Sequence, residues 1–76
     1  MEGLIEIRLS DFSRELQGYR VAAALEAILA RADRMGLEVF MYRDGPQQEY
    51  VWRITGERVP KLLTPRTKRL LAGKVR

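Results

Sequence analysis

The sequence of 76 residues contains no cysteine and no histidine. The absence of cysteine excludes disulfides and thiolate metal sites, and the absence of histidine removes the commonest metal ligand and the commonest general base. No carboxylate pair stands at a spacing that suggests acid–base catalysis, and there is no glycine-rich phosphate loop. We therefore expect no enzymatic activity, no bound metal and no cofactor.

Long apolar runs are also missing. No stretch approaches the roughly 18 residues that a membrane-spanning helix requires. The first residues, Met-Glu-Gly, carry no basic flank and are not followed by a cleavage pattern, so they do not resemble a signal peptide. These absences favour a cytoplasmic protein that does not enter a membrane.

The size and composition of the chain indicate a single globular domain with a small core. Apolar residues make up 46% of the sequence and charged residues 32%, so disorder of the whole chain is not expected. A chain of this length buries only about 60–65% of the surface that its unfolded form exposes. Because disulfides and metals are excluded, association with a second copy is the remaining way to enlarge the core, and we expect a homodimer.

Alternating apolar residues predict three strands, over residues 4–9, 37–43 and 49–55. Between the last two strands, residues 44–48 read Asp-Gly-Pro-Gln-Gln, which is turn chemistry. The second and third strands should therefore form an antiparallel hairpin. The pattern leaves open whether the first strand pairs parallel or antiparallel.

A long helix is predicted over residues 12–35, where alanine and leucine predominate. Ser10 or Asp11 would cap its amino terminus, and Gly36 would end it in a left-handed conformation. Gly18 would lie inside this helix, either as a tolerated glycine or at a kink or close contact.

The predicted helix is apolar on two sides, because its first and second halves place their apolar residues on nearly opposite faces. The first set is Phe12, Leu16, Tyr19 and Ala23, and the second is Val21, Leu25, Ile28, Ala32 and Met35. One face should cover the sheet. The other would be covered either by the carboxyl-terminal segment or by a second copy, and we expect a dimer interface at Val21, Leu25, Ile28 and Ala32.

The charge of the chain is strongly segregated. Residues 58–76 contain seven basic residues and no acidic one, so they carry +7, whereas residues 1–57 carry −3. Lysine or arginine placed on phosphate releases counterions and gives salt-dependent affinity, so this segregation favours a polyanion as partner. Within the segment, Thr64-Pro65 predicts the start of a short helix over residues 66–72, and Gly73 its end.

Three interpretations of the basic segment remain open. It can contact a nucleic-acid backbone, dock on an acidic protein surface, or remain a solvated end that keeps the protein soluble. We favour the first. The expected phosphate contacts are Arg58, Lys61, Arg66, Lys68, Arg69, Lys74 and Arg76, with Arg53 and Tyr50 as secondary candidates.

The aromatic residues of the two hairpin strands suggest a further nucleic-acid contact. Alternation places Phe40 with Tyr42, and Tyr50 with Trp52. If the two pairs share a face of the sheet, they form a patch on which unpaired bases can stack, unless that face is the core beneath the helix.

Together these patterns predict an α+β fold with a three-stranded, mainly antiparallel sheet packed on one long helix, in the order β-α-β-β. Residues 1–57 would form the core, and residues 58–76 a basic segment of the same domain.

The motifs of RNA-recognition and KH domains are absent. We expect a non-catalytic module that binds nucleic acid, specifically DNA, and has a regulatory function. The alternative is a protein-interaction module, an inhibitor or adaptor, that binds through a sheet edge, the aromatic residues or the basic segment.

Overall fold

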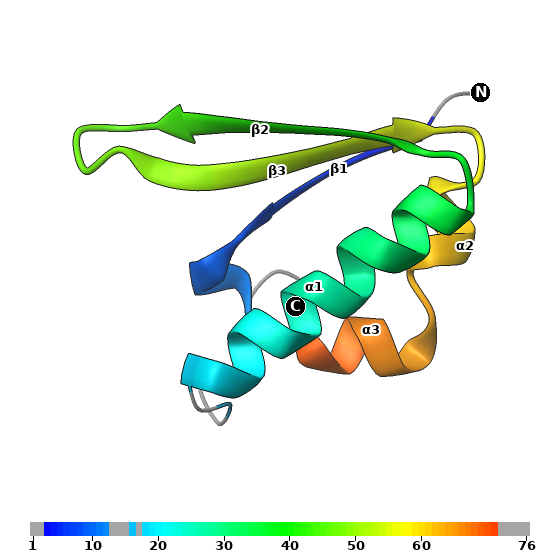
Figure 1. Cartoon of the computed structure of the whole chain (residues 1–76), viewed down its shortest axis with the longest axis horizontal. Coiled ribbons are helices and arrows are strands. Elements are labelled where there is room, and N and C mark those ends of the chain that lie inside the picture. The colour runs from blue at the N-terminus through cyan, green and yellow to red at the C-terminus, as the bar shows by residue number, and fades with distance from the viewer. Residues whose placement is uncertain (1–2, 13–15, 17, 72–76) are drawn as a thin grey trace.

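The chain folds into an antiparallel sheet with its described helices on one side of it (Figure 1). This is a computed structural model, and it describes residues 3–12, 16 and 18–71. The elements in order are β1 (Gly3–Arg8), a 3-10 helix (Leu9–Asp11), α1 (Gly18–Arg34), β2 (Glu38–Asp44), β3 (Glu49–Gly56), α2 (Val59–Leu62) and α3 (Pro65–Leu70). The expected α+β fold, three strands on one long helix followed by a short carboxyl-terminal helix, is confirmed. Helix α2 was not expected.

The sheet has the strand order β1-β3-β2, and both pairings are antiparallel. The hairpin between β2 and β3 is as predicted, and its turn contains positive φ angles at Gly45 (76°) and Gln48 (54°). The sequence left the direction of the first strand open, and the structure shows that β1 runs antiparallel to β3. Because β3 is central, β1 and β2 are both edge strands.

The strand register assigns the side chains to the two faces of the sheet. On the helix side, Ile54 lies between its partners Ile5 and Val39, and Trp52 lies between Ile7 and Met41. Side chains directly opposite each other share a face, so this row forms the inner face of the sheet. Ile5, Ile7 and Ile54 are buried there.

Helix α1 begins at Gly18 and not at residue 12, so the predicted start of the helix is wrong. The Asp11 carboxylate accepts a hydrogen bond from the backbone N–H of Arg8 at 2.8 Å, which closes the 3-10 helix instead of capping α1. Phe12 follows in an extended conformation, with φ −75° and ψ 153°, and its side chain is buried. The first residue of α1 is Gly18, and no neighbouring atom approaches the position of its missing Cβ within 4 Å.

The end of α1 agrees with the sequence. Gly36 adopts φ +74°, and its N–H donates to the carbonyl of Asp33 while that of Leu37 donates to Ala32. These two bonds form a Schellman motif, which satisfies carbonyls at the end of the helix and turns the chain into β2.

One apolar cluster joins the sheet, α1 and the carboxyl-terminal segment. Its buried members are Ile5, Ile7, Phe12, Leu25, Ile28, Ala32, Leu37, Ile54, Val59, Leu62 and Leu71. Leu62 and Leu71 are completely buried although they follow the hairpin by several residues. The described part of the basic segment is thus packed into the core, and of the two candidates for covering α1 it is this segment that does so.

The dimer interface expected on α1 is not available in this fold. Leu25, Ile28 and Ala32 are buried in the core of the chain itself, and Val21 packs against them. The second apolar face is also absent, because Phe12 and Leu16 precede the helix and Tyr19 is exposed. Residues 12–17 precede α1, so the two apolar sets in the sequence are not two faces of one helix.

We predict that Gly56→Ala destabilises the fold by about 1–3 kcal/mol, the cost of a residue held in an unfavourable backbone conformation. Gly56 has φ +147°, and an added Cβ would lie 2.5 Å from the Leu37 Cδ2 atom. Urea denaturation measures the effect. Gly18→Ala is the control, since that site is open, and it should not destabilise the chain. Equal stabilities for the two variants would contradict the backbone and packing assigned to Gly56.

Candidate functional site

The basic residues of the outer sheet face are neutralised by acids on the same face. Arg8 contacts Asp44 at 2.8 Å and Glu49 at 3.6 Å, linking β1 to the ends of β2 and β3. Arg53 contacts Glu6 at 3.4 Å, and its guanidinium lies 5.2 Å from the centre of the Tyr42 ring. These arginines are therefore engaged within the chain and serve to hold the three strands together.

The Tyr42 hydroxyl completes this network by donating a hydrogen bond to the Glu6 carboxylate across the sheet. This bond, with smaller contributions from Arg53 and Arg8, lowers the pKa of Glu6, while the same bond raises the pKa of Tyr42. The Arg8 guanidinium likewise lowers the pKa of Asp44. Beneath these side chains Val51 is fully buried, so the network also shields an apolar residue of the outer face.

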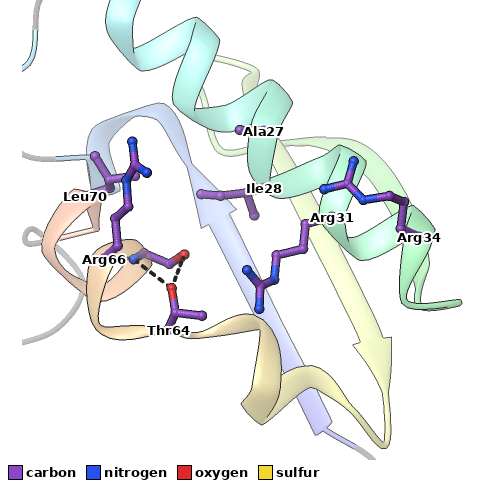
Figure 2. Close-up of a pocket in the computed structure, with 8 residues that line it drawn as sticks. Ala27, Ile28, Arg31, Arg34, Thr64, Arg66 and Leu70 are labelled. Carbon is purple, nitrogen blue, oxygen red and sulfur yellow. Dashed lines mark hydrogen bonds between the residues drawn. The ribbon is translucent and has the colours of Figure 1, made fainter.

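The helical side of the molecule presents a different arrangement, in which three arginines surround one pocket (Figure 2). Arg31 and Arg34 come from α1, and Arg66 comes from α3. The pocket has a volume of about 260 Å³. Its remaining lining consists of Ala27, Ile28, Thr64, Thr67 and Leu70.

None of these three arginines forms a salt bridge within the part of the chain that the structure describes. All three are exposed, and no acidic side chain is among the described residues that line the pocket. Several positive charges therefore converge without internal compensation, which gives a local positive potential. Guanidinium groups present forked N–H donors that match the oxygens of phosphate or carboxylate.

The position of Arg66 is fixed by the way α3 begins. The Thr64 hydroxyl accepts a hydrogen bond from the Thr67 N–H at 3.3 Å, and Pro65 occupies the first turn, as the sequence predicted. Thr67 and Leu71, one turn apart, are buried against the core. Arg66 is consequently exposed beside α1, where Figure 2 shows it on the same side of the pocket as Leu70.

The other expected phosphate contacts are exposed but spread over the carboxyl-terminal segment. Arg58 precedes α2, Lys61 lies on α2, and Lys68 and Arg69 lie on α3. Of the described members of the expected set, only Arg66 lines the pocket. Lys74 and Arg76 lie outside the described residues, as does Gly73, the expected end of the short helix.

The secondary candidates, Arg53 and Tyr50, do not share a face with each other. Arg53 pairs with Glu6 on the outer face, whereas Tyr50 is on the inner face of the hairpin and accepts a hydrogen bond from Arg43 at 2.6 Å. The aromatic pairs are divided in the same way. Phe40 and Tyr42 stack on the outer face at 6.2 Å, and Tyr50 and Trp52 lie 6.1 Å apart on the inner one. The condition for a single aromatic patch is not met.

Sequence reasoning missed Arg31 and Arg34 as site residues. The sequence pattern gave a role to the basic residues of the carboxyl-terminal segment and none to those of the long helix. The missing information was tertiary, because more than thirty positions separate Arg31 from Arg66 and only the packing of α3 brings them together. The available signal was the spacing of Arg31 and Arg34, which lie three residues apart and so share one side of a helix.

Comparison with protein-family models, curated proteins and solved structures found no match. Among the residues that the structure describes, no group of three or more metal-ligating side chains comes together. No helix in those same ranges is both long and apolar enough to cross a membrane.

We predict that Glu6→Gln lowers stability at neutral pH and flattens the loss of stability in acid. The folded-state pKa of Glu6 is depressed, so its ionised form stabilises the fold above the unfolded-state pKa. That contribution disappears as the pH falls through the folded-state pKa. The wild type should lose stability as the pH falls below about 5, and the variant less, with Asp44 retaining its own contribution.

Thermal unfolding at a series of pH values measures this difference. Glu57→Gln is the control, because Glu57 is exposed in the turn after β3 and forms no salt bridge with another described residue. It should follow the wild-type profile. A Glu6→Gln profile parallel to that of the wild type would show that the Glu6–Tyr42 bond does not contribute to folding.

Proposed function

We propose that the protein is a non-catalytic, regulatory nucleic-acid-binding module that contacts the phosphate backbone of duplex DNA with its basic helical side. The observation that carries the proposal is the convergence of Arg31, Arg34 and Arg66 on one pocket. Further exposed cations lie on or next to α2 and α3: Arg58, Lys61, Lys68 and Arg69.

The arrangement suits a backbone contact because the arginines are held by packed helices. Ile28 on α1 and Thr67 on α3 are buried beside the pocket, so the spacing of the guanidiniums is supported by the core. Each cation placed on a phosphate displaces condensed counterions, which gives affinity without requiring contacts to base edges. The function therefore needs neither a metal nor a catalytic group.

Duplex DNA is favoured over single-stranded RNA by the positions of the aromatic residues. Recognition of single strands depends on aromatic side chains that stack bases beside a positive groove. No aromatic residue is among the described residues that line the arginine pocket. Tyr42 and Tyr50 are instead covered by Arg53 and Arg43 of the same chain, at 5.2 and 4.9 Å.

A protein-interaction module is the second candidate, and one observation favours it: strand β2 is exposed at the edge of the sheet. Such an edge can bind an extended strand of another protein. An acidic protein surface could also contact the arginines. The expected cytoplasmic location remains a prediction.

The test is a salt titration of binding to random-sequence duplex DNA and to single-stranded RNA, by fluorescence anisotropy with the full chain. With six or more phosphate contacts, affinity for duplex DNA should fall by several powers of ten between about 50 and 200 mM salt. The triple variant Arg31→Gln/Arg34→Gln/Arg66→Gln should reduce the slope of log K against log salt by about 3, one for each lost contact.

Arg43→Gln is the single-charge control, because it removes an exposed arginine from the hairpin, away from the pocket. It should leave the slope close to that of the wild type, whereas Arg31→Gln alone should lower it by about 1. Circular dichroism of each variant establishes that the fold is retained. Absence of binding by the wild type at low salt, or an unchanged slope in the triple variant, would refute the proposed function.

A further inference from the structure

Strand β2 is an edge strand that is open on both of its faces. Every side chain from Glu38 to Asp44 is exposed except Tyr42, which is half-buried. The centre of the strand is apolar: Val39 is 41% exposed, Phe40 63% and Met41 51%. Since β2 pairs only with β3 within the described chain, its other side presents unpaired backbone groups beside this apolar row.

The other edge, β1, is protected by the rest of the fold. Ile5 and Ile7 are buried, Glu6 and Arg8 place charges on its outer face, and α2 packs against it. Proteins commonly protect edges with charges, proline, bulges or covering elements, because an exposed flat edge pairs with other strands. The stretch from Val39 to Tyr42 has neither a charge nor a proline. The contrast between the two edges singles out β2 as a pairing surface.

The sequence of β2 is complementary to itself in one antiparallel register. When Phe40 lies opposite Phe40 of a second copy, Val39 lies opposite Met41 and Glu38 opposite Tyr42, so that the apolar centre of each strand faces apolar residues. Cross-strand pairs of this kind are favourable. In this symmetric arrangement each copy contributes the same set of residues to the interface.

The symmetric registers centred on the next two residues, Met41 and Tyr42, are less favourable. A shift that centres the pair on Met41 places Glu38 opposite Asp44 at both ends, and directly opposed like charges are destabilising. Centring on Tyr42 places Phe40 opposite Asp44 and Met41 opposite Arg43, which separates the apolar residues. Moving the centre by one residue slides one strand by two residues relative to the other. Such even offsets keep the inner and outer faces of the two sheets in line, because side chains alternate along a strand.

We propose that the protein forms a homodimer by antiparallel pairing of β2 with β2 of a second copy, centred on Phe40. The two sheets then join into one, with the helices of both copies on the same side because the two-fold axis is perpendicular to the sheet. This interface differs from the one that the sequence suggested, since it uses the sheet edge and leaves α1 in the core. It is also independent of the arginine pocket, which lies between α1 and α3.

Sedimentation equilibrium of the full chain, up to about 100 µM, tests the proposal through mass action. The wild type should approach twice its monomer mass of 8.8 kDa. Phe40→Glu and Phe40→Lys should each be monomeric, because the register places like charges face to face. An equimolar mixture of the two variants should again dimerise, since it places Glu opposite Lys at the same position.

Leu4→Glu is the matched control. Leu4 is exposed to 59%, close to the 63% of Phe40, and lies on the same face but on the opposite edge strand. This variant should dimerise like the wild type. Circular dichroism establishes that each variant is folded.

Three results would overturn the proposal. A wild-type mass that stays at 8.8 kDa would show that β2 does not pair with a second copy, and a strand of a different protein would then be the candidate partner of this edge. A dimeric Phe40→Glu variant would place the interface on another surface. A mixture of Phe40→Glu and Phe40→Lys that remains monomeric would exclude the pairing centred on Phe40. The DNA titration probes a different surface, because Arg31, Arg34 and Arg66 lie on α1 and α3.

Discussion

The structure depends on burial of the carboxyl-terminal segment against α1 and the sheet. Val59, Leu62, Thr67 and Leu71 are buried, while the charged residues between them face outward. The same segment therefore completes the core and displays the positive charge. Its arginines are placed near those of α1, and the repulsion between them opposes folding, whereas apolar burial favours it. An anion bound in the pocket would relieve this repulsion and stabilise the folded chain through linkage.

The sheet and the end of α1 could be predicted from local patterns because each depends on residues close together in the chain. Alternation determined the strands, and Gly36 determined the end of the helix through its left-handed conformation. The start of α1 could not be predicted in the same way, because Asp11 has the chemistry of a helix cap but accepts a hydrogen bond from Arg8. Helical propensity in the following residues gave no indication of that turn.

The surfaces on which the two proposals rest were harder to predict because they depend on register and packing. Alternation established that Phe40 accompanies Tyr42 and that Tyr50 accompanies Trp52, but the pairing of β2 with β3 places the two pairs on opposite faces. The arginine pocket combines residues from α1 and α3, whose proximity follows from burial of Leu71 and not from spacing. Composition did indicate correctly that the carboxyl-terminal cations lack acidic neighbours in the sequence.

The two proposed surfaces are physically compatible because they lie on different parts of the molecule. Pairing through β2 extends the sheet sideways and leaves the helices uncovered, so each copy would retain its arginine pocket. A two-fold axis perpendicular to the sheet would keep both helical layers on one side, and a duplex that reached both pockets would contact both copies at once. Binding of the second pocket would then be intramolecular, and its effective concentration would raise affinity without any new contact within either copy. A small core with a modest positive surface can in this way gain DNA affinity from association.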